Sequence, residues 1–400
     1  MYEGKSVFAQ IMTSIHDTQF ARCVQQYGGH HKVSRFRCWD QWLAMGFAQL
    51  SYRESLRDIE NCLRTRPDLY HLGFRAAICR STLAEANESR DWRIYHDLAQ
   101  ILIRKARKLY VNDPTGLEIT ESIYAIDATT IDLCLSLFPW ARFRKTKAAI
   151  KLHTQLDLKG SIPVQIHITD GKTHEVNWMD DLAWETGSIY LMDRGYVDFQ
   201  RLFKIDQAGA FFVIRAKDNL AHTRLESYPV TDDVISDQRI SLANFYAKKD
   251  YPRPLRRVRI YDPEHQRFLV FLTNNFSLSA ETIALLYKNR WKVELFFKWI
   301  KQHLRIKAFY GTSENAVCTQ IWIAIATYLI VAIKKKELGV EKSLHEILQK
   351  TSVSLFEKVP LYELFTKEHS PIPDVVFSNQ LLFNGLYPDS SDPKCLFIAP

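Results

Sequence analysis

The stretch from about residue 120 to 217 constrains the fold most, because strand-like and helix-like runs follow one another there in a definite order. Three β-branched and aromatic runs come first, "SIYAIDATTIDLCLSLF", "AAIKLHTQLDL" and "IPVQIHITDG", with Gly160 and Ser161 as a hairpin turn between the last two. A helix "HEVNWMDDLAW", a strand "SIYLMD", a helix "VDFQRLFKIDQAG" and a strand "AFFVIRAK" follow. The order β-β-β-α-β-α-β predicts a mixed α/β sheet with helices packed against it.

The flanking segments read differently. Residues 1–115 are expected to be helical: Leu56, Ile59 and Leu63 recur at helical spacing, and Ser81 and Thr82 are candidate N-caps for a following helix. These two helices match a helix-turn-helix weakly, and an ordinary helical bundle fits equally well. Residues 218–280 return to strand-like sequence and are rich in Lys and Arg, so we expect a basic, β-rich insertion. Helices are expected again over 281–335, followed by a C-terminal region, 336–400, that ends in a loop-rich tail.

Composition narrows the class of protein. The chain has 400 residues, 46% of them hydrophobic and 24% charged, which is ordinary for a globular protein. Its net charge of +8 favours a polyanionic partner, although a soluble protein can also simply be basic. The longest apolar run, 321–333, is shorter than the roughly 20 residues that a membrane span needs, so we expect a buried core helix and no membrane partner. The seven cysteines include no C-x-x-C pair, which indicates reduced, buried cysteines, Cys134 among them, in a cytoplasmic protein.

Two carboxylates follow buried strands. "IYAI" runs into Asp127 and "IYLM" runs into Asp193. An ionised Asp at the end of a buried strand is costly unless a partner compensates it. Ligands of open α/β sheets gather at the carboxyl ends of the strands, and carboxylate oxygens suit Mg²⁺ or Mn²⁺. If the two strands are neighbours, both carboxylates face one site. The alternative for each Asp is a residue that caps a turn.

A third carboxylate stands in residues 281–304, "ETIALLYKNRWKVELFFKWIKQHL", which contain no Pro or Gly and are expected to form one helix. At 100° per residue, one sector about 60° wide holds Tyr287, Arg290, Glu294 and Lys301. Trp291 and Lys298 border this sector, and the core side of the helix is expected to consist of Val293, Phe296, Ile300 and Leu304. The alternative is a solvated face with an ion pair between Arg290 and Glu294.

These motifs resemble a known family. The spacing Y-x2-R-x3-E-x6-K, complete here as Tyr287, Arg290, Glu294 and Lys301, is similar to the signature of the bacterial DDE-type insertion-sequence transposases of the family named after insertion sequence four. The surroundings of the two aspartates, "AIDATTIDL" and "LMDRGYVDF", also look like that family, as does "FLTNNFSLSAETIALLYKNRW". The N-terminal part is similar to a small domain often found ahead of this catalytic core. The resemblance fades after about residue 345.

The resemblance implies an RNase-H-like catalytic core, residues 118–217 and 281–335, which the β-rich block 218–280 interrupts. It implies a helical region for binding DNA ends over 1–115 and a C-terminal region with a possible dimerisation role over 336–400. Asp127, Asp193 and Glu294 would bind two Mg²⁺ or Mn²⁺ ions and catalyse strand cleavage and strand transfer. DNA contacts would come from Tyr287, Arg290, Lys301, Trp291 and Lys298. The substrates would be double-stranded terminal inverted repeats and target DNA, bound by a homodimer in the bacterial cytoplasm at the nucleoid.

Two alternative functions share these residues. An RNase-H-like nuclease or resolvase would use the same carboxylates to cut DNA without joining it. A non-catalytic protein would only occupy transposon ends, although intact Asp127, Asp193 and Glu294 argue against that reading. The sequence does not identify the repeat or target sequences, a hairpin intermediate, the oligomeric state without DNA, or whether this copy is active.

Overall fold

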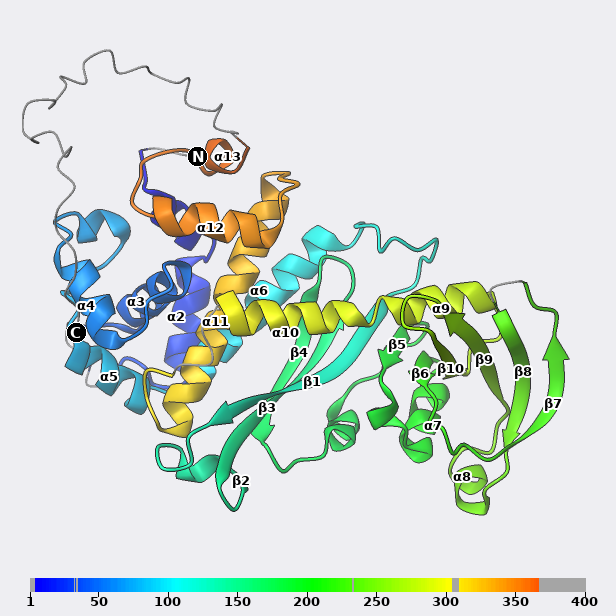
Figure 1. The fold of residues 1–400 in the computed structure, drawn as a ribbon. Helices are drawn as coiled ribbons and strands as arrows, with labels where there is room; N and C mark the ends of the chain where they lie inside the picture. Colours follow the sequence, from blue (N-terminus) through cyan, green and yellow to red (C-terminus); the bar gives the residue numbers. More distant parts are fainter. Residues whose placement is uncertain (1–3, 32, 34, 232–233, 304–308, 367–400) are drawn as a thin grey trace, which may run out of the picture. The chain divides into compact units, whose positions relative to one another are not determined.

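The N-terminal part of the chain is helical, as its apolar periodicity predicts. A computed structural model describes residues 4–366 apart from 32, 34, 232–233 and 304–308. The α-helices of this part are α1 (Val7–Met12), α2 (Asp17–Gln26), α3 (Cys38–Leu50), α4 (Leu56–Arg64), α5 (Arg80–Ser89) and α6 (Arg93–Tyr110), and a 3₁₀ helix η1 (Leu69–Leu72) lies between α4 and α5 (Figure 1). The predicted N-caps are wrong, because α5 begins at Arg80 and its N-cap is Cys79, so Ser81 and Thr82 lie in its first turn.

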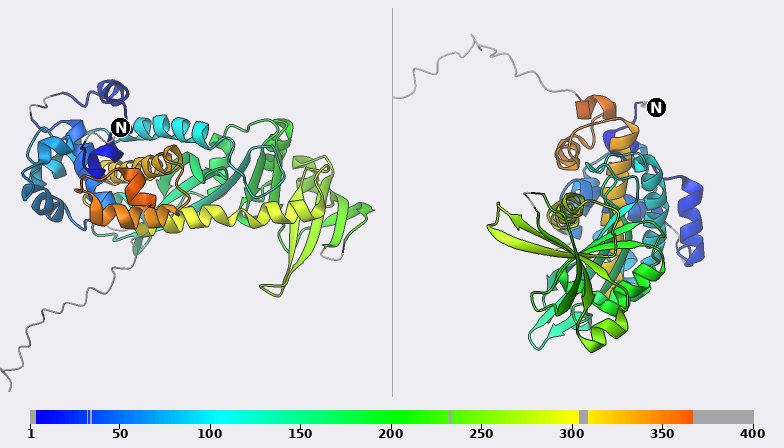
Figure 2. Two further views of the ribbon diagram at one scale, coloured as in Figure 1. Left: turned by 90° about the horizontal axis from the view of Figure 1, so that it is seen from above. Right: turned by 90° about the vertical axis from the view of Figure 1, so that its right-hand side faces the viewer.

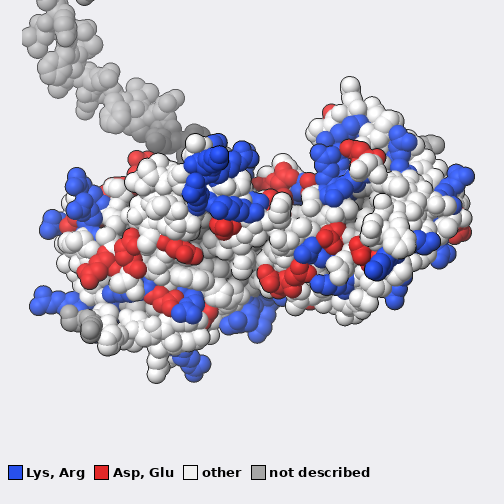
Figure 3. Space-filling view, turned by 90° about the horizontal axis from the view of Figure 1, so that it is seen from below, with Lys and Arg blue, Asp and Glu red and all other residues white. Residues whose placement is uncertain are grey.

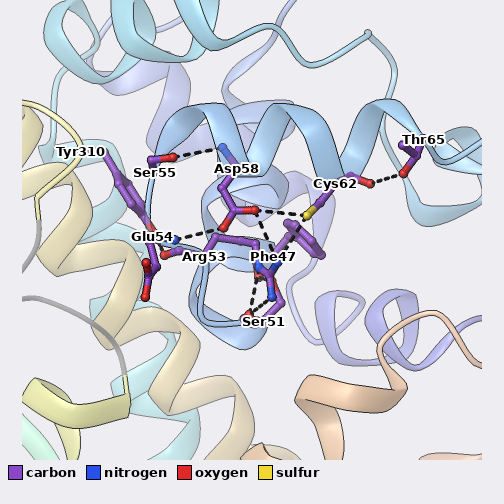
Figure 4. A network of polar contacts seen from close by, with 9 residues as sticks. All are labelled: Phe47, Ser51, Arg53, Glu54, Ser55, Asp58, Cys62, Thr65 and Tyr310. Carbon is purple, nitrogen blue, oxygen red and sulfur yellow. Dashed lines mark hydrogen bonds and ion pairs between the residues drawn. The ribbon is translucent and has the colours of Figure 1, made fainter. Parts of the chain in front are cut away.

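The arrangement of α4 and α5 contradicts a helix-turn-helix. Fifteen residues, 65–79, separate the two helices, whereas the turn of that motif has about three or four. Arg53 fixes the segment before α4: its guanidinium donates to the Ser51 carbonyl at 2.6 Å and lies 3.5 Å from Asp58 (Figure 4). The Tyr310 hydroxyl donates to the Arg53 carbonyl at 2.7 Å. This bond connects the segment before α4 to the chain just before α11. The helices themselves pack on one another, α2 on α6 and α4 on α5, and α3 and α6 pack on α11, so this part of the chain is a helical bundle.

A large mixed sheet follows the helices. Its strands are β1 (Ile123–Leu133), β2 (Arg142–Arg144), β3 (Lys147–Asp157), β4 (Ile162–Asp170), β5 (Ile189–Met192), β6 (Phe211–Arg215), β7 (His222–Tyr228), β8 (Val234–Leu242), β9 (Leu255–Asp262) and β10 (Arg267–Thr273). The strand order is β2-β3-β1-β5-β6-β10-β9-β8-β7, and β4 also pairs with β3. β1, β5 and β6 run parallel, whereas β3 is antiparallel to β1 and β4. The mixed α/β sheet expected from the order of the runs is confirmed.

The turn between β3 and β4 lies where the sequence predicts it. Gly160 has φ +72° and Ser161 has φ 54°, so both residues adopt the left-handed backbone conformation of a tight turn. Gly160 is required for a second reason, because a Cβ at this position would overlap the ring of Tyr110 on α6. The Tyr110 hydroxyl in turn donates to the Ala332 carbonyl at 2.8 Å. One aromatic side chain thus joins the hairpin to two helices.

The strands of residues 218–280 continue the same sheet. β10 pairs antiparallel with β6, and β9, β8 and β7 follow outward (Figure 1). A short helix, α8 (Phe245–Asp250), interrupts this block. The expected strands "RRVRIYD" and "RFLVFLTN" are present as β9 and β10.

Shorter helices connect the core strands. α7 (Phe199–Gln207) is present as expected between β5 and β6. The expected α-helix over "HEVNWMDDLAW" is instead a 3₁₀ helix, η3 (Glu175–Asp181), in which the Asn177 amide bonds to His174 three residues back. Another 3₁₀ helix, η4 (Arg194–Tyr196), starts directly after Asp193, and η2 (Pro139–Ala141) precedes β2. The remaining helices are α9 (Ala280–Lys288), α10 (Trp291–His303), α11 (Glu314–Glu337), α12 (Leu344–Ser354) and α13 (Leu361–Thr366).

Helix α11 lies at the centre of the helical part. It contacts α3, α5, α6 and α12, and its residues from Ala316 to Ile333 are buried. It is long and apolar enough to cross a bilayer, but its most apolar window is completely buried inside the protein. The buried core helix expected over 321–333 is confirmed. α10 lies on β1 and along one side of the sheet (Figure 2).

The cysteines are only partly as expected. All six in the described residues are free, and Cys23, Cys38 and Cys318 are buried. Cys134 is exposed, however, because β1 ends at Leu133 and the chain turns away from the sheet there. Cys395 and the predicted loop-rich tail lie outside the described residues.

Candidate active site

Two aspartates lie where the parallel pairing of two neighbouring strands ends. β1 and β5 are parallel, and their register ends with Ile126 opposite Met192. Asp193 directly follows the last residue of β5. Asp127 lies inside β1, which continues to Leu133, so the expectation that this aspartate ends its strand is wrong: beyond Ile126, β1 keeps pairing with β3 after its pairing with β5 has stopped. Both strands are buried up to this point. The parallel pairing therefore brings the two carboxylates together where β5 ends, as expected if the strands are neighbours.

Helices α9 and α10 add a third carboxylate and a cation. The Tyr287 hydroxyl at the end of α9 donates to Oδ1 of Asp193 at 3.2 Å. The Arg290 guanidinium donates to Oδ2 of Asp127 at 3.2 Å and to Oε1 of Glu294 at 2.6 Å. Arg290 thus connects the carboxylate of β1 with that of α10. The structure brings together five of the residues that the sequence singled out.

The expectation of one continuous helix over 281–304 is wrong. α9 ends at Lys288 and α10 begins at Trp291. Asn289 lies in the break: its side-chain amide donates to the Leu285 carbonyl, and the Arg290 amide bonds to Tyr287 three residues back. An Asn side chain that competes for backbone groups and a turn with this shorter spacing tighten the chain locally. The core side of α10 is as predicted, with Val293, Phe296 and Ile300 buried; Leu304 lies outside the described residues.

Burial sets the protonation of the site. It raises the pKa of Asp127 to about 6, partly offset by the Ala128 amide and the charge of Arg290. Burial also raises the pKa of Tyr287 to about 12, so that its hydroxyl is a neutral donor at pH 7. Burial opposes the charge of Arg290, but Tyr287, Glu294 and Asp127 outweigh it and raise the pKa of the guanidinium. The site thus holds a permanent cation between one largely buried carboxylate, Asp127, and one half-exposed carboxylate, Glu294.

Two further side chains near the aspartates were missed by sequence reasoning. The Tyr196 hydroxyl is buried and has no hydrogen-bond partner among the described residues. Burial and then the charges of Asp127, Glu175 and Asp193 raise the pKa of Tyr196. Glu175 also acts on Asp127 and pairs with Lys151 at 3.5 Å. The position of Tyr196, three residues after Asp193, could have indicated that it lies near the site. No local sequence pattern places Glu175 near Asp127, because the path of the chain through η3 brings it close.

The remaining predicted DNA contacts lie further along α10. Nζ of Lys301 donates to the Thr130 carbonyl of β1 at 2.8 Å, so this ammonium group lies beside the strand that carries Asp127. The Trp291 side chain is 55% exposed. Lys298 is exposed and borders a separate cavity of about 980 Å³ whose wall also includes Lys292 and Lys335. In the described part of the chain, neither Trp291 nor Lys298 has a polar contact with the three carboxylates.

The donor set suits a hard divalent cation. Three carboxylates supply the oxygen ligands that Mg²⁺ and Mn²⁺ prefer. Arg290 already places a positive charge between two of them, which indicates that this spot stabilises a cation. Among the described residues, the only group of three potential ligands within 4.8 Å of one another is Asp262, Glu264 and His265, at the turn between β9 and β10. Those side chains are exposed or half-buried, and exposed acidic groups are common without a metal.

Comparison with known proteins identifies the family. A family model described as a transposase DDE domain matches residues 118–330, more than half of the chain. The chain belongs to the DDE transposase family. A second model, a domain of unknown function, matches residues 3–75 of this transposase.

Curated relatives agree with this assignment. The chain is 29% identical over 252 residues to a protein of Geobacillus stearothermophilus described as a transposase for insertion sequence element IS5377, over 63% of this chain and 66% of that protein. It is 32% identical over 257 residues to the protein y4zB of Sinorhizobium fredii, also described as a transposase, over 63% of this chain and 70% of that protein. The transposase therefore spans about two thirds of these relatives.

A solved structure is also similar. It is the piggyBac transposase synaptic complex with hairpin DNA, at 10% sequence identity and a TM-score of 0.43, over 91% of this chain and 80% of that one. That TM-score is too low to support any inference about the fold or the site.

Proposed function

We propose that this DDE transposase cuts DNA strands at the ends of an insertion sequence and joins them to target DNA, with divalent metal bound by Asp127, Asp193 and Glu294. One observation carries the proposal: two aspartates, next to the last residue pair of the parallel strands β1 and β5, share a connected group of contacts with Tyr287, Arg290 and Glu294. The five strands β4-β3-β1-β5-β6 would be the sheet of an RNase-H-like core, with residues 218–280 as its insertion.

The metal would act at the reacting phosphate. When bound, Mg²⁺ or Mn²⁺ ions, two in the proposed site, would supply positive charge that stabilises the attacking and leaving oxygens of an in-line displacement. Asp127, Asp193 and Glu294 would hold these ions, and Arg290 would leave the two carboxylates that it now contacts. The freed guanidinium would then bind a phosphate of the DNA, for which its planar, two-pronged donor geometry is suited.

Other side chains would position the DNA. The neutral Tyr287 hydroxyl would hold Asp193 in place and donate to the substrate. Lys301 would contact a phosphate beside β1, and Lys298 and the exposed Trp291 would extend the contact surface along α10. An exposed indole can stack on a base without regard to sequence.

The outer parts of the chain would organise the complex. The helical region 1–115 would bind transposon ends, and 336–400, most of it outside the described residues, would take part in dimerisation. We infer that a homodimer acts on paired inverted repeats, in the bacterial cytoplasm at the nucleoid. A basic net charge of +8 is consistent with a DNA partner.

A labelled inverted-repeat end from the flanks of the gene tests the proposal. Incubated with the protein, Mg²⁺ and a target plasmid, it is expected to give nicked or cut ends and joined products, and none with EDTA. Cleavage without joining would favour a nuclease or resolvase. Binding without cleavage in Mg²⁺ or Mn²⁺ would favour a non-catalytic end-binding protein and contradict the proposal.

A further inference from the structure

A short basic hairpin stands at the far end of β1. It comprises residues 142–147, "RFRKTK", which contain four cations and no acid: Arg142, Arg144, Lys145 and Lys147. All four side chains are exposed, and within the described part of the chain none is paired with a carboxylate. The hairpin, which includes β2, lies at the lower side of Figure 1. Figure 3 views the molecule from below and shows several clusters of Lys and Arg on this face, with patches of Asp and Glu between them.

The hairpin is held in place rather than loose. β2 pairs with β3, with Arg142 opposite Ala148. Phe143 is half-buried and lies against Gly171 at the end of β4, where even a Cβ would come within 2.7 Å of its ring. The Arg144 guanidinium lies 5.0 Å from the centre of the Phe143 ring. The aromatic ring thus anchors the hairpin against the sheet and supports one of its cations.

Two positive charges of the hairpin face and repel each other. Arg144 lies directly opposite Lys147 across the two strands. Like charges in this position destabilise a β-ladder, and no acidic side chain of the described residues compensates them. A bound polyanion would remove this repulsion. The arrangement therefore fits a phosphate backbone better than it fits a structural role.

One cation of the hairpin, Arg142, shares a face of the sheet with the candidate site, whereas Lys147 and the paired Arg144 point to the other face at the same edge. Asp127 pairs with Thr154, and the regular antiparallel register continues to Leu133 opposite Ala148, which in turn lies opposite Arg142. Because side chains alternate along a strand, Asp127, Leu133 and Arg142 point to the same side. Asp127 and Leu133 are six steps apart along β1, roughly 20 Å at about 3.3 Å per residue, which equals the length of about six base pairs of B-DNA.

We propose that the basic hairpin of residues 142–147 binds the DNA phosphate backbone about six base pairs from the cleavage position. This inference rests on the proposed function and deepens it, because it names the surface that holds the DNA beyond the reacting phosphate. The hairpin contributes affinity without reading sequence, since its cations meet phosphates, which carry no base information.

Duplexes of different length test the inference. Starting from a repeat end with about three base pairs on each side of the cleavage position, each side is extended separately to about twelve. Affinity is measured by fluorescence anisotropy in Ca²⁺, over a range of salt concentrations. The test variant carries Arg142→Gln, Arg144→Gln and Lys145→Gln. The control carries Arg142→Lys and Arg144→Lys, which keep the charge, and circular dichroism checks that both variants fold.

For the wild-type protein, extension of one side is expected to tighten binding at least about tenfold, since several phosphates are added. The test variant should lose most of this gain, and the slope of log affinity against log salt on the long duplex should fall by about 2 to 3, near one for each cation removed. The control variant with Lys at positions 142 and 144 should keep most of the gain in affinity with duplex length and most of the salt dependence. An unchanged length gain and salt slope in the test variant overturn the inference while leaving the proposed function intact. Failure of the wild-type protein to bind any repeat end overturns both.

Discussion

Arg290 is the residue on which the geometry of the candidate site converges. Its guanidinium contacts Asp127 and Glu294, two of the three carboxylates proposed to bind metal. The helical spacing of residues 287–301 predicted that Tyr287, Arg290 and Glu294 share one surface, because that relation is local. The contacts with Asp127 and Asp193 and the approach of Glu175 depend on strand pairing and on a 3₁₀ helix, which no local pattern encodes.

In the proposed site a metal ion displaces Arg290 from these carboxylates, so Arg290→Gln should bind Mn²⁺ more tightly. Hydrogen bonds to charged groups contribute about 1.5 to 3 kcal/mol, and 1.4 kcal/mol corresponds to a factor of ten, so we expect Mn²⁺ affinity to rise by about 10- to 100-fold. Electron paramagnetic resonance of free Mn²⁺ measures this without any catalytic turnover. Arg253→Gln, which removes an exposed arginine paired with Asp206, is the control for the loss of net charge. Equal or weaker Mn²⁺ binding by Arg290→Gln would contradict competition between arginine and metal.

At the scale of elements, local signals located most strands and helices but not their ends. The β3–β4 turn was predictable because Gly160 and Ser161 favour left-handed backbone. The break between α9 and α10 was not, since "LYKNRWKV" contains no Pro or Gly, and a single Asn such as Asn289 also occurs inside unbroken helices. Cys134 was wrongly predicted to be buried, because the apolar run that contains it continues past Leu133, the last residue of β1.

Gly160→Ala should destabilise the protein more than Gly187→Ala. Both glycines have a positive φ, +72° and +80°, so both variants carry the backbone cost of about 1 to 2 kcal/mol. Only at position 160 would the new Cβ overlap Tyr110, whereas nothing lies within 4 Å at position 187. Overpacking of this kind adds about 1 to 3 kcal/mol, which urea unfolding can resolve. Equal losses in the two variants would show that contact with Tyr110 does not constrain the hairpin.

At the scale of the whole molecule, the partners of the strands and helices could not be predicted from the sequence, because they depend on contacts between distant parts of the chain. The mixed sheet was predicted from the order of its strands, but its continuation through β10 to β7 was not, because strand-like runs carry no record of their partners. The buried helix α11 was predicted from its apolar run, whereas its contacts with α3, α5 and α6 became visible only in the fold. The same long-range packing brings residues 127, 193 and 294 to one site.

The most direct test of the central claim is strand cleavage by Glu294→Gln. This variant keeps the size of the side chain but removes one of the three carboxylates. Since even residues that only support metal ligands are worth about 10- to 100-fold in activity, cleavage of a labelled repeat end should fall by more than about a hundredfold. End binding should stay within about twofold. Glu281→Gln on α9, outside the site, is the matched control and should cut normally. Normal cleavage by Glu294→Gln would remove this glutamate from the mechanism and contradict the proposed active site.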